Sequence, residues 1–469
     1  MSGVRTGSRQ GGGAIVTVAA LSAAFGGVLV QVIVDLAAAL SASGLDELGQ
    51  VALMMSVVGV VFFGIAVFVG GIVTANAVST VIAGRTREIA LLRLLGASGR
   101  SLRGEVVRTG LLQGVLGAVI GTVVAVVLVA GAAELAIRGG ALPRFDYPLV
   151  SPGLLLPVVA VTVSNVVASW SGSRQVLAVT PAQAAGSSAE PRYDELRGRR
   201  ARNAVAILLV VLGVALLALG VWVGVGLVNP AGVLLGLVGG MVSFTGVIVG
   251  APVLLPPLTA SVGRAFGRGP VARLASANAI RNPARSARAV IGLVIGVTLV
   301  TMFAVAAETF SSVMRSTGEM KPEVYAAFEQ FIAVSTAVMS VLLGFSVLLA
   351  AVGMVNTLSL SVLQRRRELG LLRALGFTGG QVRSMVVLEA AQMIVAAALL
   401  GVVLGVFYGW CGAVSVFGSI DGIGLVPPTI PVPILVSVLL VAVVITVVSA
   451  VLPARRATRV SPVEALAVA

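Results

Sequence analysis

The chain has 469 residues, of which 58% are apolar and 11% are charged, about half the charged fraction of a typical soluble domain. Its mean hydropathy of +1.08 and its long apolar runs identify an integral membrane protein. The chain has no histidine, which excludes imidazole metal sites and histidine-dependent nucleophile pairs, and its one cysteine excludes an intrachain disulfide. Its one lysine lies between Met320 and Pro322, which excludes a P-loop nucleotide site.

Ten apolar stretches are long enough to cross a bilayer as helices, which takes roughly 20 residues each. In chain order they cover residues 13–40, 51–77, 110–133, 151–173, 204–226, 231–258, 289–307, 328–360, 386–410 and 431–453. The first is too long for a signal peptide and is interpreted as a retained anchor. No proline lies from Glu323 to Leu363, so the eighth span is predicted to project beyond the bilayer. The sequence therefore predicts an all-α integral membrane protein with ten transmembrane helices.

The basic residues fix the orientation of these spans. The net charge is +14, but the arginines lie in small groups between apolar spans and not on one soluble domain, which argues against a nucleic-acid partner. With the N-terminus in the cytoplasm, 28 of the 32 Lys and Arg residues lie on the inner side. Both termini are therefore predicted to be cytoplasmic, and the outer loops are too short for a folded domain.

The chain contains an internal repeat, which self-comparison of the sequence reveals. Residues 76–103 align without gaps on residues 356–383, and twelve of the 28 positions are identical. Identical polar pairs such as Asn76/Asn356 and Glu88/Glu368 are not explained by an apolar composition. Each copy holds four spans, an even number, so the two copies have the same orientation.

The repeat predicts four regions along the chain. The first repeat covers residues 1–185, a cytoplasmic linker covers 186–203, a two-helix spacer hairpin covers 204–258 and the second repeat covers 259–469. The fold class is therefore two parallel four-helix repeats joined by a two-helix spacer.

Within each copy, a short amphipathic segment closed by glycine follows the copy's second span, at residues 87–96 and 367–376. An interfacial helix on anionic lipid is one interpretation. Anionic lipid repels carboxylates, yet Glu88 and Glu368 are both present, which favours contact with a protein partner. Within the spans, Asn76, Asn165 and Asn356 are among the few polar side chains and are interpreted as contacts between helices. No charged residue lies at a bilayer midplane, which disfavours an ion-coupled transporter.

These residues resemble the FtsX-like permease family of ABC transporters, also called MacB-like or type VII. The family's R-E-hydrophobic-x-L-L-R-x-L-G stretch matches residues 87–96 and 367–376, and its terminal P-A-R-R-A…P-x-E-A-L stretch matches residues 453–466. The first copy departs from the terminal pattern, because Gln183 stands in place of the glutamate. The ten-span duplicated arrangement is similar to that of Bce-type permeases, but it lacks their large extracellular domain.

The resemblance implies that each short segment is a coupling helix that docks on a separate ATPase subunit. The residues carried over for this contact are Arg87, Glu88 and Arg93 for one ATPase and Arg367, Glu368 and Arg373 for the other. ATP and magnesium would be bound by the two ATPase copies, so the chain itself is expected to hold no cofactor and to be no enzyme. The implied location is the bacterial cytoplasmic membrane.

The expected function is a permease subunit of exporter or mechanotransmission type, which couples ATP hydrolysis to efflux of an amphipathic or lipophilic substrate. The alternative is a non-transporting signalling protein that regulates an envelope partner, as FtsX itself does within the family. Whether an extracellular partner takes part stays open.

Overall fold

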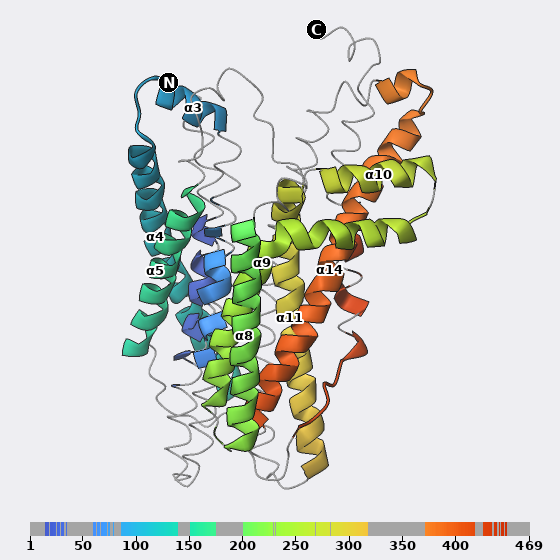
Figure 1. The fold of residues 1–469 in the computed structure, drawn as a ribbon. Helices are drawn as coiled ribbons and strands as arrows, with labels where there is room; N and C mark the ends of the chain where they lie inside the picture. The colour runs from blue at the N-terminus through green and yellow to red at the C-terminus, as the bar shows by residue number, and fades with distance from the viewer. Residues whose placement is uncertain are drawn as a thin grey trace, which may run out of the picture. The chain divides into compact units, whose positions relative to one another are not determined.

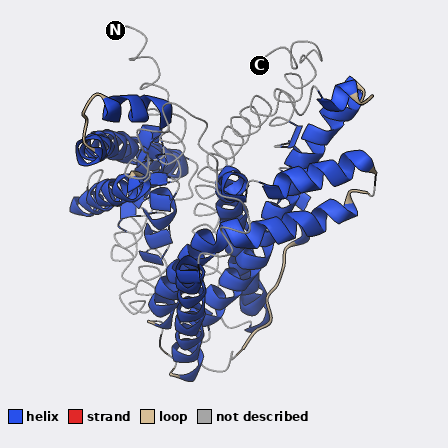
Figure 2. Ribbon diagram, turned by 45° about the horizontal axis from the view of Figure 1, so that its top comes forward, coloured by secondary structure: helices blue, strands red, loops and turns tan. Residues whose placement is uncertain are grey.

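The computed structural model describes residues 15–34, 60–78, 86–138, 151–174, 200–317, 371–417 and 425–447, apart from some positions within these ranges. Helices are the only regular elements in these ranges (Figure 2). The chain divides into two compact units, Met1–Ser188 and Ala189–Ala469. Six of the described helices are long and apolar enough to cross a membrane, as a multi-pass membrane protein requires.

The first unit is built around α4 (Gly99–Arg138), which packs against α5 (Leu155–Gly172) and the apolar helix Ile15–Val28 (Figure 1). A short 3-10 turn, η2 (Pro152–Leu154), precedes α5. Small residues allow the close packing: Ala19, Ala23 and Ala118 are buried together with Val161 of α5. The short helix α3 (Thr86–Leu94) precedes α4.

The second unit contains α8 (Arg200–Gly226), α9 (Gly232–Ala265), α10 (Pro270–Arg281), α11 (Pro283–Thr317) and α14 (Gly379–Phe417). In Figure 1, α9 bends along its length and its C-terminal part lies beside α10, and the two helices are in contact. Three prolines inside α9 account for the bend, since each removes a backbone donor and crowds the preceding turn.

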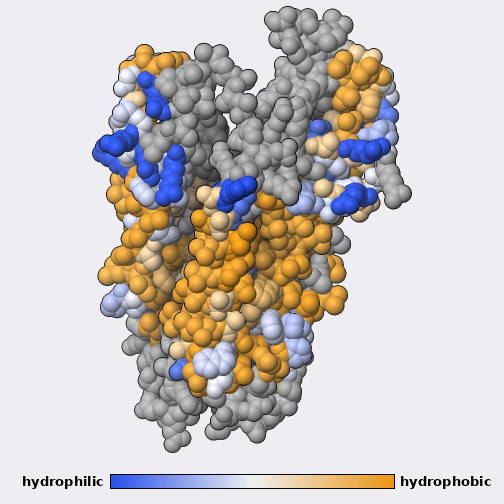
Figure 3. Space-filling view, in the orientation of Figure 1, coloured by the Kyte–Doolittle hydropathy of each residue, from blue (hydrophilic) through white to orange (hydrophobic). Residues whose placement is uncertain are grey.

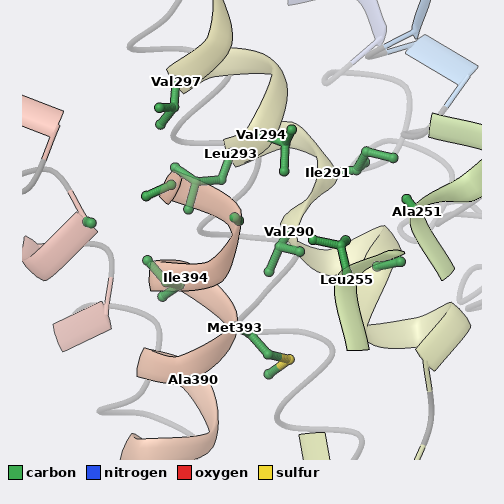
Figure 4. Close-up of a cluster of buried hydrophobic side chains, with 14 of the residues drawn as sticks. Ala251, Leu255, Val290, Ile291, Leu293, Val294, Val297, Ala390, Met393 and Ile394 are labelled. Carbon is green, nitrogen blue, oxygen red and sulfur yellow. The ribbon is translucent and has the colours of Figure 1, made fainter. Parts of the chain in front are cut away.

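The core of the second unit lies where α9, α11 and α14 meet. Figure 4 shows Leu255 of α9, Val290 and Val294 of α11 and Ile394 of α14 in one apolar cluster. The membrane-spanning windows of α11 and α14 are 67% and 56% buried, whereas that of α8 is 22% buried. The centre of this unit is therefore the α11–α14 pair, with α8 at its periphery.

The helices α4 and α14 begin at matching positions of the repeat and bury the same face. A Cβ atom added at Gly121 of α4 would collide with the carbonyl group of Ala20, and one added at Gly401 of α14 would lie 2.8 Å from the Val297 side chain of α11. Glycine at both positions lets the backbones approach.

Six predicted spans are confirmed as helices, those at 110–133, 151–173, 204–226, 231–258, 289–307 and 386–410. The helices α4 and α14 begin before the predicted spans, because their polar first turns are helical too. The overlong eighth span lies outside the described residues. The count of ten spans, the four-helix composition of each repeat and the boundaries at 185, 203 and 258 stay predictions.

Candidate functional site

The first candidate site is the corner at which α3 turns into α4. The chain leaves α3 through Gly96, whose φ of 98° lies in the left-handed region that favours glycine. The N–H of Gly96 donates to the Arg93 carbonyl at 3.1 Å, and the N–H of Ala97 donates to the Leu92 carbonyl at 3.0 Å. These two bonds form a Schellman motif. Ser98 then caps α4 by accepting a hydrogen bond from the N–H of Ser101 at 3.0 Å.

The second unit contains the same corner at the matching positions of the repeat. Gly376 has a φ of 100°, and its N–H donates to the Arg373 carbonyl at 3.1 Å. The N–H of Phe377 donates to the Leu372 carbonyl at 3.0 Å. Thr378 and Gln381 cap α14 reciprocally, with bonds of 3.2 and 2.8 Å. Both copies therefore end the short helix and begin the long one with the same backbone geometry.

Both corners expose leucines. Leu91 and Leu95 are 49% and 85% exposed in the first corner, and the matching Leu371 and Leu375 are 52% and 72% exposed in the second. In Figure 3, orange surface covers α3 and also the turn before α14, at the ends of the units that carry blue basic side chains. Exposed leucines at a polar end are typical of an interaction surface, and this makes them candidate contact residues.

Each corner is also attached to the body of its own unit. In the first, Ile89 of α3 packs against Ile15, Val78 and Leu102. In the second, Leu372 and Phe377 pack against α10 and the first turns of α14. Each corner is therefore packed against other helices of its own unit.

Arg103 links the first corner to α5. Its guanidinium donates to the Trp170 carbonyl at 3.0 Å and to the Ser173 hydroxyl at 3.2 Å, and it lies 4.5 Å from the Trp170 ring centroid. Arg174 also faces this ring, at 4.9 Å. Such cation–π contacts stabilise an arginine against an aromatic face, so Arg103 joins α4 to the C-terminal end of α5.

The structure places the residues predicted from sequence as follows. Arg93 and Arg373 occupy matching, half-buried positions in the two corners. Arg87 and Glu88 belong to α3, but their side chains lie outside the described part of the chain, as do Arg367, Glu368, Asn76 and Asn356. Asn165 is buried in α5 and donates to the Gly110 carbonyl of α4 at 3.3 Å.

The prediction of a short helix closed by glycine is confirmed in the first copy, and in the second copy for the described residues 371–376. The exposed leucines were missed as candidate contacts. Their signal was present, since Leu91 matches Leu371 and Leu95 matches Leu375 in the repeat alignment. Sequence reasoning favoured the charged residues because leucines are common throughout this chain.

Replacing Gly96 by alanine is expected to destabilise the first corner by about 1 kcal/mol, because a left-handed backbone costs an L-residue roughly that much. A Cβ atom at this position meets nothing within 4 Å, so the cost comes from the backbone alone. Hydrogen exchange of the α3 amides would measure it. Gly104→Ala in α4 is the control, since its Cβ also meets nothing within 4 Å, and equal exchange in both variants would contradict the prediction.

The comparisons with known proteins agree with this duplicated arrangement. The sequence model of the FtsX-like permease C-terminal family matches residues 60–181 and 340–462, which together make up more than half of the chain. Each match includes one corner.

Two curated relatives match smaller parts of the chain. The ABC transporter permease YknZ of Bacillus subtilis is 28% identical over 144 residues, which are 31% of this chain and 34% of YknZ. An ABC transporter permease of Methanocaldococcus jannaschii is 30% identical over 121 residues, which are 26% of this chain and 30% of that protein. The matches thus span about a third of each relative. The family match is the broader one, and the chain belongs to the FtsX-like permease family.

Proposed function

We propose that this chain is the permease subunit of an ABC transporter and that its two corners are docking sites for two separate ATPase subunits. The observation that carries this proposal is the pair of exposed leucines at matching positions in both corners. Relatives named ABC transporter permease support the same assignment.

The geometry of the corners suits the transmission of force. The Schellman motif and the capped start of α4 leave little freedom between α3 and α4. At 40 residues, α4 is about 60 Å long, enough to reach across the bilayer. When two ATPase subunits bind ATP and close, a push on α3 would therefore move α4 and, through Arg103, α5.

The substrate proposed for this transporter is amphipathic or lipophilic, moved outward across the bacterial cytoplasmic membrane with both termini in the cytoplasm. The orientation rests on the distribution of basic residues along the sequence. The substrate class rests on the strongly apolar composition of the spans. In the alternative, the same corners would drive an envelope partner and no substrate would move.

The proposal is tested by capturing this chain from native membranes in mild detergent and counting the ATPase copies that come with it. Two copies per permease are expected for the unaltered chain, and Glu88→Lys with Glu368→Lys is expected to release them. Glu134→Lys on the outer side is the control, because its ion pair with Arg138 is exposed and contributes little. Capture of no ATPase by the unaltered chain would overturn the proposal.

A further inference from the structure

The two copies of the repeat differ in what covers one face of their long helices. The α4 ridge consists of Leu112, Leu116, Ile120, Val124 and Leu128, which recur every four residues on one side of α4. These side chains are 43–58% exposed. The α14 ridge, at the matching positions of the second copy, consists of Gln392, Ala396, Leu400, Leu404 and Tyr408. Gln392, Ala396 and Tyr408 are 0%, 1% and 8% exposed, and the two leucines are partly buried.

The spacer hairpin, α8 with α9, covers the α14 ridge. At one end, a Cβ atom at Gly263 of α9 would lie 3.1 Å from the Gln392 side-chain oxygen. In the middle, Leu400 and Leu404 pack against a cluster that Ala251 and Leu255 of α9 share with residues of α11 and α14.

The contact continues to the far end of α14. The hydroxyls of Ser243 and Tyr408 share a hydrogen bond of 2.9 Å, and the Phe244 ring meets the Tyr408 ring edge-on at 6.2 Å. Beyond them, a Cβ atom at Gly224 of α8 would lie 2.5 Å from the Ser415 carbonyl oxygen. The hairpin therefore follows α14 over most of its membrane-spanning length.

The side chains of each ridge suit its surroundings. Helices associate in membranes through small residues and hydrogen bonds, and the contact of the hairpin with α14 uses Ser415 and the hydroxyl of Tyr408 in this way. The α4 ridge holds only leucine, isoleucine and valine, which are as apolar as lipid acyl chains. The glycines Gly110, Gly114, Gly117 and Gly121 lie along the part of α4 that packs on protein.

We propose that the α8–α9 hairpin is a fixed seal that keeps lipid from the α14 ridge, and that lipid acyl chains contact the matching α4 ridge. The hairpin lies outside both stretches matched by the family model, which are residues 60–181 and 340–462. It makes the copies inequivalent toward the bilayer. A lipophilic molecule can approach the long helix from the membrane at the α4 ridge and not at the α14 ridge.

Quenching of a fluorophore by brominated lipid tests this proposal without any ATPase, so its failure is distinct from failure of the proposed function. Single cysteines at positions 120, 124, 400 and 404 would be introduced with Cys411→Ala, which removes the chain's one cysteine. After labelling and reconstitution, labels at 120 and 124 are expected to be quenched several-fold more deeply than labels at 400 and 404.

Matched controls come from a second pair of positions. Val123 and Val403 are 58% and 66% exposed, so labels there should be quenched equally in both copies. Quenching at 404 as deep as at 403 would show that the hairpin does not seal α14. Shielding at 124 equal to that at 404 would show that protein covers the α4 ridge. Either result overturns the proposal.

A disulfide between α9 and α14 tests the seal without a bulky label. A Cβ atom at Gly236 would lie 3.6 Å from the Ser415 hydroxyl oxygen, so side chains at these two positions are neighbours. Gly236→Cys with Ser415→Cys and Cys411→Ala is expected to form the bond in native membranes, detected as a linked peptide by mass spectrometry. Gly240→Cys with Ser415→Cys is the control, because a Cβ atom at Gly240 meets nothing within 4 Å. Absence of the 236–415 link would overturn the seal.

Discussion

Aspartate in place of both Leu95 and Leu375 is expected to remove the two ATPase subunits from the purified transporter. The two leucines are 85% and 72% exposed, so neither contributes much to packing within its own unit. Burial of a leucine in a partner's groove contributes about 2 kcal/mol, and a buried carboxylate without a partner adds a desolvation cost. Binding at each corner should therefore weaken by roughly 100-fold or more.

The single variants separate the two corners. Leu95→Asp alone should leave one ATPase bound through the second corner, and Leu375→Asp alone should leave one through the first. An acidic residue near a helix C-terminus costs about 0.3–1 kcal/mol, which is small beside the expected loss of binding. ATPase copies per permease, counted after capture in mild detergent, provide the measurement.

Leu425→Asp is the matched control for these variants. Leu425 is 69% exposed but lies outside both corners, in the segment that follows α14. This variant should keep both ATPase subunits and confirm that one exposed carboxylate does not unfold the chain. Retention of both subunits by the Leu95→Asp, Leu375→Asp chain would show that the exposed leucines are not the docking surface.

The positions of the six described spans were predictable from sequence, because a continuous apolar run is a strong signal for a membrane helix. The predicted spans at 204–226 and 231–258 correspond to α8 (Arg200–Gly226) and α9 (Gly232–Ala265). Hydropathy missed the polar first turns of α4 and α14, because capping at Ser98 and Thr378 determines where those helices begin.

The corners were predictable as local structure but not as surfaces. A glycine after an amphipathic segment predicts the end of a helix, and Gly96 and Gly376 fulfil that role with positive φ values. Which leucines stay exposed depends on distant residues, such as Ile15 in the first unit and Val271 of α10 in the second, that cover the other sides of the corners. Sequence spacing alone does not contain that information.

The seating of the hairpin on α14 could not be predicted at all. The glycines of α8 and α9 indicate close packing, but they do not indicate which helix each glycine faces. Only the structure separates Gly220, which opposes the backbone of α9, from Gly224, which opposes Ser415 of α14. Glycines of α8 thus allow close contact both with α9 inside the hairpin and with α14 outside it.

Gly220→Ala is expected to destabilise the hairpin by about 1–3 kcal/mol, whereas Gly240→Ala in the same hairpin should be neutral or slightly stabilising. A Cβ atom at Gly220 would lie 2.6 Å from the Gly232 carbonyl oxygen and 2.7 Å from the Gly236 nitrogen. Both are backbone atoms, so α8 and α9 must move apart to admit the methyl group. A Cβ atom at Gly240 meets nothing within 4 Å, so that substitution only improves helix propensity.

Thermal unfolding of the two variants in detergent would show the difference as a lower midpoint for Gly220→Ala alone. Because α9 also covers the α14 ridge, separation of α8 from α9 should loosen that cover, and a label at position 404 in the Gly220→Ala chain should become more accessible to brominated lipid. The same label in the Gly240→Ala chain should stay shielded. Equal unfolding midpoints for the two variants would mean that α8 and α9 do not approach closely at Gly220. A lower midpoint for Gly220→Ala with the label at position 404 still shielded would mean that α9 stays packed on α14 without α8.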